Sequence, residues 1–221
     1  MTWGPWRAAV IAALLAAPAF AQSPAQSPKD HQHRFSDAHK WSQVFDDPAR
    51  DAWQKPHEVV QALKLAPDAA VADIGAGTGY FAVRFAHMLA KGRVYGVDLE
   101  PDMVKYLAER AKKENLPNLT AVAGAPDSPR LPAPVDLVIL VDVYHHVDKR
   151  EAYFRKLLGS LKPGGRIAII DFRLDSPSGP PKNMRIAPDR VKAELKQAGY
   201  ALSEELEFLP RQYFLIFKPG A

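Results

Sequence analysis

Residues 71–81 read VADIGAGTGYF, a short strand-like run that ends in three alternating glycines. Glycine in such a loop lets the backbone adopt positive φ angles and approach a ligand closely. The apolar positions that follow are spaced as on one face of a helix, which we expect over residues 80–90. A helix N-terminus presents unpaired N–H groups to an electron-rich ligand. The stretch therefore predicts a strand, a ligand-binding loop and a helix.

The spacing of the glycines separates two kinds of nucleotide site. A dinucleotide fingerprint, G-x-G-x-x-G, needs a third glycine at position 80, where this chain has Tyr80. Asp98, 23 residues after Gly75, ends the next expected strand, 94–97. A carboxylate there can accept hydrogen bonds from both ribose hydroxyls, or it can simply stabilise the turn before a helix. The pattern disfavours a nicotinamide-dependent oxidoreductase, which stays a lesser alternative.

Strands and helices alternate along the rest of the chain. Helices are expected from Pro56 onward, over 101–113 and over 189–197. Another is expected to begin at Asp148 and Glu151, which have the spacing of a capping box, and to end at residues 162–165. Strands are expected over 69–74, 94–97, 119–123, 135–141, 167–172, 202–209 and 213–218. The last two are joined by three residues and must be antiparallel neighbours. We predict an α/β fold: a Rossmann-like, doubly wound, mostly parallel seven-stranded sheet with a C-terminal antiparallel hairpin.

The N-terminal segment has the layout of a secretory signal peptide, assigned to residues 1–21. Arg7 gives a positive start, residues 8–17 are apolar, and Ala19-Phe20-Ala21 is a small-x-small cleavage site. The apolar run is too short to span a bilayer, so no stable membrane insertion is expected after cleavage. We therefore predict that the protein is exported to a bacterial periplasm. Two alternatives remain: the segment stays uncleaved as a membrane anchor, or the leader is not used and the protein is cytoplasmic. Residues 22–34 read as a flexible spacer.

Composition narrows the chemistry further. Apolar residues make up 47% of the chain and charged residues 24%, as expected for a globular domain. The net charge of +4 is too small and scattered to indicate a nucleic-acid partner. Without cysteine there is no thiol nucleophile or thiolate metal site. His31, His33 and His39 are a weak metal signal and a better match to a solvated arm, so no metal site is expected.

Several stretches together resemble the class I S-adenosylmethionine-dependent methyltransferases over roughly positions 56–218. These are VADIGAGTGYF, VYGVDLEPDMV (94–104), VDLVILVDVYHHV (135–147), LKPGGRIAIIDF (161–172) and the terminal hairpin. The resemblance implies S-adenosyl-L-methionine as cofactor and a methyltransferase domain over 35–221, with residues 35–66 as an N-terminal helical cover. Trp41, Phe45 and Trp53 either form a lid over the acceptor or pack against the sheet edge.

The resemblance also implies a role for each cofactor-binding position. The loop residues Gly75, Ala76, Gly77 and Gly79 would wrap the methionine part of the cofactor, with Asp73 bracing the loop. Asp98 would hold the ribose, Leu99 would pack on the adenine, and Asp142 would lie beside the methionine moiety or the methyl group. Many relatives carry an acid directly after the glycine that ends the third strand. Here the acid is displaced two residues to Asp127, so either Asp127 or a backbone group meets the adenine amino group.

Candidate catalytic residues follow the fourth expected strand: Tyr144, His145 and His146. Ligands of open α/β sheets bind beyond the carboxyl ends of strands, and methyl transfer needs a base only when the acceptor must lose a proton. The alternative is that the two histidines pack around the next helix. The predicted function is methyl transfer to an unidentified small-molecule acceptor, because the Asn/Asp-Pro-Pro-Tyr run of DNA amino-methyltransferases is missing. An exported binding protein of this fold without turnover is the alternative.

Overall fold

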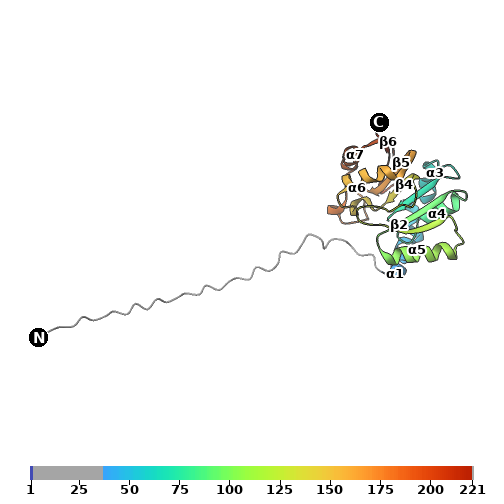
Figure 1. Ribbon diagram of the computed structural model, residues 1–221, viewed down its shortest axis with the longest axis horizontal. Helices are drawn as coiled ribbons and strands as arrows, with labels where there is room; N and C mark the ends of the chain where they lie inside the picture. Colours follow the sequence, from blue (N-terminus) through green and yellow to red (C-terminus); the bar gives the residue numbers. More distant parts are fainter. Residues whose placement is uncertain (2–36, 221) are drawn as a thin grey trace. The chain divides into compact units, whose positions relative to one another are not determined.

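The computed structural model describes Met1 and residues 37–220 of the 221-residue chain (Figure 1). The predicted signal peptide and spacer lie outside the described residues. No helix among those described is long and apolar enough to cross a bilayer.

Seven strands form one mixed sheet in the order β3-β2-β1-β4-β5-β7-β6. Their bounds are β1 (Ala70–Ile74), β2 (Arg93–Asp98), β3 (Leu119–Ala123), β4 (Val135–Val141), β5 (Leu161–Phe172), β6 (Tyr200–Leu206) and β7 (Gln212–Pro219). The first five strands are parallel, and β7 runs antiparallel between β5 and β6. The predicted fold class, including the C-terminal hairpin, is confirmed.

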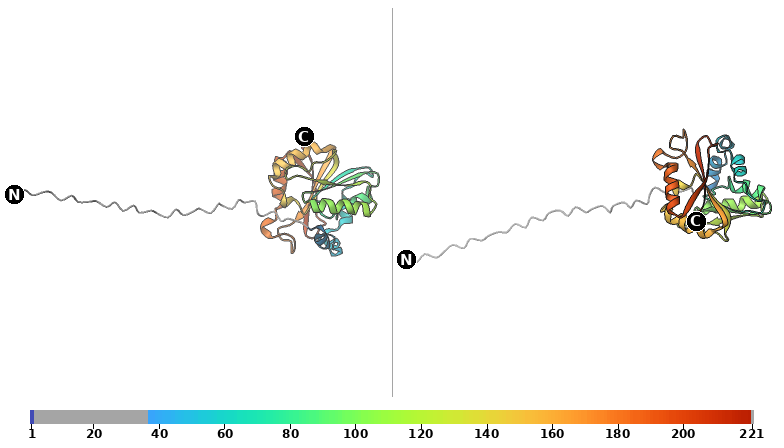
Figure 2. Two further views of the ribbon diagram at one scale, coloured as in Figure 1. Left: turned by 60° about the horizontal axis from the view of Figure 1, so that its bottom comes forward. Right: turned by 90° about the horizontal axis from the view of Figure 1, so that it is seen from above.

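Helices cover both faces of the sheet, as Figures 1 and 2 show. The longer ones are α1 (Ala38–Phe45), α3 (Pro56–Ala62), α4 (Ala82–Met88), α5 (Pro101–Lys113), α6 (Arg150–Leu157) and α7 (Pro188–Gln197). The short ones are η1 (Pro48–Arg50), α2 (Asp51–Gln54), η2 (Tyr144–His146), η3 (Leu158–Ser160) and η4 (Lys182–Met184). One apolar core joins α3, α4 and α5 to the sheet, and a second joins α6 and α7 to the other face. Burial on both faces explains why the central strands read as continuous apolar runs.

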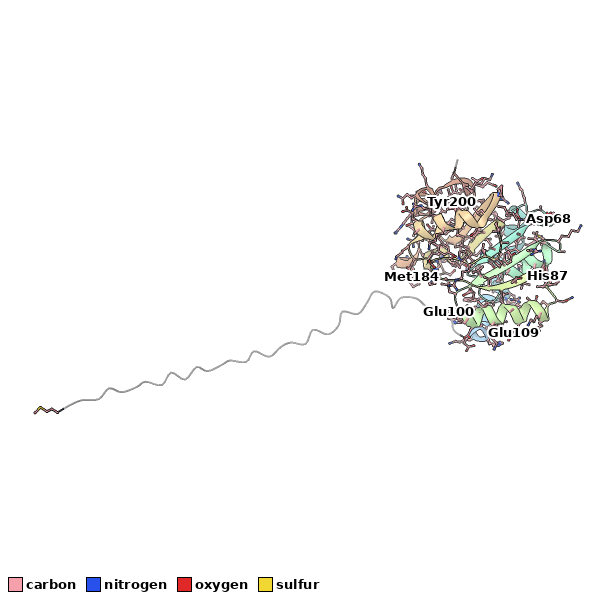
Figure 3. The ribbon with its side chains drawn as sticks, viewed as in Figure 1. Asp68, His87, Glu100, Glu109, Met184 and Tyr200 are labelled. Carbon is pink, nitrogen blue, oxygen red and sulfur yellow. The ribbon has the colours of Figure 1, made fainter. Side chains whose placement is uncertain are left out.

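The strand order places a ligand crevice at one edge of the sheet. From β1 the chain proceeds outward to β2 and β3, and it then returns to add β4 and β5 on the other side. In open α/β sheets, ligands bind at such a switch point, beyond the carboxyl ends of the strands. Figure 3 shows Met184, in the loop after β5, at the left of the domain and Glu100, which follows β2, towards its bottom. Asp68, which precedes β1, lies at the upper right, so the carboxyl edge faces the lower left in this view.

The expected capping box of the sixth helix is wrong. Helix α6 begins at Arg150, and its N-cap is Lys149 in the left-handed conformation, with no side-chain cap. Glu151 instead pairs with Arg155 one turn later on the helix. The spacing that suggested the cap therefore reflects an ion pair within the first helical turns.

Residues 162–165 do not close that helix, as the sequence suggested. They lie inside β5, which begins at Leu161 rather than at residue 167. The register against β4 shifts there, because Val135 pairs with Leu161 whereas Leu137 pairs with Arg166. Gly164, at φ 78°, allows the strand to bulge where a side chain would be strained.

Two buried tyrosines near the end of the chain give a stability prediction. The Tyr200 hydroxyl donates to the Phe154 carbonyl at 2.8 Å, whereas the Tyr213 hydroxyl has no partner among the described residues. We expect Tyr200→Phe to lower the free energy of unfolding by about 1 kcal/mol, because a hydrogen bond is lost. Tyr213→Phe should leave it unchanged or raise it by up to about 1 kcal/mol, because an unsatisfied polar group is removed. Urea unfolding of both variants checks this, and equal losses would contradict it.

Candidate active site

The glycine loop between β1 and α4 has the backbone conformation that its sequence predicts. Gly75, Gly77 and Gly79 have φ angles of 73°, 55° and 97°, which side chains rarely adopt. A Cβ atom on Gly79 would lie 2.5 Å from Leu107 Cδ1, so there is also no room for one. The loop is tied to β2 by the Gly75 N–H, which donates to the Val97 carbonyl at 2.8 Å. The glycines are required here by both conformation and space.

Asp98, the last residue of β2, holds the middle of this loop. Its Oδ2 accepts from the Gly77 N–H at 2.8 Å, and its Oδ1 accepts from the Glu100 N–H at 3.0 Å. Burial raises the pKa of Asp98 above its usual value, while these backbone donors favour the carboxylate. The neighbouring Leu99 side chain is half exposed, an uncommon position for a leucine beside a buried acid. Asp98 and Leu99 thus present an acceptor and an apolar surface at one place.

Asp73, in β1 beneath the loop, is almost fully buried. Burial raises its pKa from 3.8 to about 7, although the backbone of Ala82, at the start of α4, donates to it and Arg50 lies near. The carboxyl group therefore joins β1 to the N-terminus of the helix that follows the loop. The bracing role that the resemblance implies for Asp73 stays a prediction.

The buried Asp73 carboxyl should make stability depend on pH. The pKa of Asp73 is about 7 in the folded protein and 3.8 ordinarily. Its contribution to the free energy of unfolding is therefore complete below about pH 4 and is lost as the pH rises through about 7. We expect Asp73→Asn to remove this loss, which amounts to about 1–4 kcal/mol at roughly 1.4 kcal/mol per pKa unit. The measurement is urea unfolding of the wild type and the variant at pH 4.5 and 7.5. Parallel stability changes in the two proteins would contradict the assignment.

Asp142, directly after β4, belongs to a closed ring of hydrogen-bonded side chains: Arg50, Gln54, Gln212 and Asp142. The Arg50 Nη2 donates to Gln54 Oε1 at 3.1 Å and faces Asp142 Oδ2 at 3.4 Å. The Gln54 amide donates to Gln212 Oε1 at 2.7 Å, and the Gln212 amide donates to Asp142 Oδ1. Burial raises the pKa of Asp142, and Arg50 opposes this rise. The ring fixes the carboxylate between the N-terminal helices and β7.

His145, in η2 after β4, is held by a carboxylate. Its Nδ1 lies 2.9 Å from Asp171 Oδ2, and its backbone N–H also donates to Asp171 at 3.2 Å. Only 3% of each of these two side chains is exposed. The His146 ring lies against the His145 ring, with centroids 4.1 Å apart. A histidine whose Nδ1 is fixed by a carboxylate has its Nε2 available for a proton, which is how general bases are oriented.

Two predicted site residues have other partners. The Tyr144 hydroxyl is buried and donates to Glu194 Oε2 at 2.6 Å. The Asp127 side chain is 74% exposed and accepts from Lys156 Nζ at 2.7 Å. Both roles stay predictions, but neither of these hydrogen bonds joins the side chain to the glycine loop or to the ring around Asp142.

Four residues of this arrangement were missed by sequence reasoning: Arg50, Gln54, Asp171 and Gln212. Asp171 had a usable signal, because it lies at the carboxyl end of β5 as Asp98 lies at that of β2. The other three lie outside the parallel strands, in the N-terminal helices and at the start of β7. No local pattern marks them.

The N-terminal helices contact the glycine loop directly. The Phe45 ring lies over Gly77, where an added Cβ atom would be 3.2 Å from Phe45 Cδ2. Arg110 of α5 donates both to Asp46 and to the Thr78 carbonyl, each at 3.0 Å. The segment after α1 is thus attached to the loop through a ring contact and a shared guanidinium.

The two remaining aromatic residues of the expected cover have different neighbours. Trp41 stacks on Phe45, with centroids 5.3 Å apart. Trp53, in α2, packs against Phe172 at the end of β5 at 5.6 Å. Phe45 and Trp53 therefore lie at the carboxyl edge of the sheet, and Trp53 also packs against the sheet itself.

Comparison with known proteins agrees with this geometry. Residues 71–165 match the family model described as a methyltransferase domain. A solved structure of an S-adenosylmethionine-dependent methyltransferase from Aquifex aeolicus is 25% identical, with a TM-score of 0.75, over 82% of this chain and 97% of that one. Residues 71–165 of the chain thus resemble a methyltransferase domain.

The curated relatives of this chain are longer proteins. The erythromycin 3''-O-methyltransferase of Saccharopolyspora erythraea is 30% identical over 141 residues, which cover 61% of this chain and 45% of that protein. The trans-aconitate 2-methyltransferase of Rhodopseudomonas palustris is 29% identical, over 64% of this chain and 52% of that protein. The chain thus spans about half the length of these relatives.

S-adenosylmethionine is the cofactor on which the Aquifex aeolicus enzyme depends, and the described residues of this chain fit that cofactor. The loop of positive-φ glycines contains a buried hydroxyl, Thr78 Oγ1, that has no partner among the described residues. Asp98 retains lone pairs beyond its two backbone donors, and Leu99 offers an exposed apolar surface beside it.

Proposed function

We propose that this chain is an S-adenosylmethionine-dependent methyltransferase that acts on a small molecule. The observation that carries the proposal is the junction of the glycine loop with Asp98. This junction joins a loop of positive-φ glycines, a carboxylate held by backbone N–H groups and a half-exposed leucine at the carboxyl edge of the sheet. The names of the relatives support the acceptor class, since the two quoted above are named for erythromycin and trans-aconitate.

The cofactor supplies an activated methyl group, and the chain's own residues supply position and proton transfer. Under the proposal, His145 takes a proton from the acceptor at Nε2 while Asp171 fixes the opposite nitrogen. The burial of both side chains keeps bulk water away from the imidazole. The ring around Asp142 holds the neighbouring carboxylate still, so the acceptor meets a preorganised edge.

Calorimetry tests the cofactor part of the proposal. S-adenosylhomocysteine is expected to bind the purified protein, and NAD is not. The activity itself is tested by transfer of a labelled methyl group from the cofactor into small molecules of a cell extract. Tight NAD binding without binding of the thioether would overturn the proposal. Thioether binding with no transfer to any acceptor would favour a binding protein without turnover.

We also propose that the protein is exported, with cleavage after Ala21. The support is the order of Arg7, the apolar run and the small-residue site in the sequence. Expression of the full chain in a bacterium, followed by fractionation and N-terminal sequencing, tests this. Export predicts a periplasmic product that begins at Gln22, and a cytoplasmic product that begins at the initiator residue would overturn it.

A further inference from the structure

The loop after β5 contains an arginine, Arg185, that binds backbone carbonyls rather than carboxylates. The Arg185 guanidinium donates to the carbonyls of Ser176, Leu174 and Pro180 at 2.6, 3.1 and 2.9 Å. A carbonyl partner satisfies the N–H groups but leaves the positive charge uncompensated. The loop therefore carries a fixed cation beside the carboxyl edge of the sheet.

Arg211, just before β7, is the second such cation. Its guanidinium lies 5.2 Å from the centre of the Trp53 ring, and its Nη1 donates to Ser178 Oγ at 2.9 Å. Among the half-buried arginines of residues 37–220, all have a carboxylate within 4 Å except Arg185 and Arg211. A partly desolvated guanidinium without a counter-ion is a strong site for an anion, because its fork of donors matches carboxylate and phosphate oxygens.

The chain places this cation next to the reacting end of the proposed site. Arg211 is adjacent to Gln212, whose amide binds the Asp142 carboxylate. Trp53, on which Arg211 lies, is adjacent to Gln54 of the same ring. The partly exposed Trp53 ring, which packs on the buried Phe172, supplies an apolar surface at this point. A small molecule that approaches Asp142 and His145 from this side would meet the apolar Trp53 ring and the Arg211 guanidinium, which has no carboxylate partner.

We propose that the methyl acceptor is a small anion, and that Arg211 binds its carboxylate or phosphate while Trp53 contacts its apolar body. This inference rests on the proposed function and names the substrate class for the same site. Arg185 supports the site as a fixed charge that raises the local positive potential. Arg50 remains committed to Asp142 and is not needed as the anion's partner.

The test is calorimetry on the full chain saturated with S-adenosylhomocysteine, using benzoate, phenyl phosphate and the neutral isostere benzamide as probes. We expect at least one anion to bind about tenfold or more tightly than benzamide, as a charge-assisted hydrogen bond implies. The stronger of the two anions identifies the acceptor's group as carboxylate or phosphate. Equal binding of all three probes would overturn the proposal.

Matched variants assign the effect to Arg211. Arg211→Gln should weaken the preferred anion about tenfold, whereas Arg211→Lys, which keeps the charge, should recover most of the affinity. Lys113→Gln removes one positive charge from the exposed end of α5 and should leave the affinity for the preferred anion unchanged. Thermal unfolding verifies that each variant is folded. If Lys113→Gln weakens the anion as much as Arg211→Gln, the effect is one of net charge and the proposal fails.

The order of the measurements separates this inference from the proposed function. Failure of S-adenosylhomocysteine to bind the wild type would contradict the proposed function itself. Normal binding of the thioether without any preference for anions would contradict only the acceptor class.

Discussion

Replacement of His145 by glutamine is expected to lower kcat by about 10²–10⁴-fold, which is the usual contribution of a positioned general base. Glutamine can approximate the length of the side chain, and its amide can still meet Asp171, but it cannot take up a proton. The measurement is the initial rate of labelled methyl transfer at saturating cofactor, with the acceptor found in the extract screen. Affinity for S-adenosylhomocysteine should stay within about threefold of the wild-type value, because the hydrogen bonds of His145 go to Asp171 and not to the glycine loop.

The neighbouring histidine provides the control for this prediction. His146 stacks on His145, but it is the His145 ring that Asp171 holds, so His146→Gln should retain most of the rate. The rate of Asp171→Asn should lie between those of the two histidine variants, because this change disturbs the orientation of the imidazole without removing it. If His146→Gln loses more activity than His145→Gln, the roles of the two histidines are reversed.

The fold and the cofactor loop are predictable from sequence because their signals are local. Three glycines at alternate positions are needed wherever the backbone takes φ angles of 73°, 55° and 97° at those positions. Asp98 is similarly local, since it ends the strand that lies beside this loop. The hairpin follows from the shortness of the corner between β6 and β7.

The acceptor end is not predictable in this way, because its partners come from distant parts of the chain. The Gln54–Gln212 hydrogen bond joins residues 158 positions apart, and Arg50 meets Asp142 across 92 positions. Glutamine and arginine at these places have no periodicity or spacing that distinguishes them from surface residues. The pairing of His145 with Asp171 likewise depends on β5 lying beside β4. Tertiary contacts, rather than local propensity, assemble this half of the site.

The difference between local patterns and tertiary contacts also explains why the predicted cap of α6 and the predicted start of β5 are wrong. The spacing of Asp148 and Glu151 fits a capping box, but Glu151 is engaged by Arg155 and the helix begins later. The Pro-Gly-Gly run looks like a helix stop, yet it is a bulge that lets β5 extend alongside β4. In both cases one local pattern is compatible with two structures, and packing against the sheet selects between them.

Replacement of Asp98 by asparagine is expected to raise the Kd for S-adenosylhomocysteine about 100-fold. The carboxylate accepts from the Gly77 N–H with one oxygen and from the Glu100 N–H with the other, whereas asparagine has a single acceptor and would turn an NH₂ group towards a donor. The change therefore removes the expected charged partner of the ribose and also loosens the middle of the glycine loop. A hydrogen bond to a charged group is worth about 1.5–3 kcal/mol, and a 100-fold change in Kd corresponds to about 2.8 kcal/mol. Asp136→Asn is the matched control, because Asp136 also accepts a backbone N–H, from Ala70 at 2.7 Å, but at the opposite edge of the sheet. Calorimetry should show that Asp136→Asn binds S-adenosylhomocysteine as tightly as the wild type, and urea unfolding should show that both variants are folded. If Asp98→Asn binds the thioether within about threefold of the wild type, the ribose is held elsewhere.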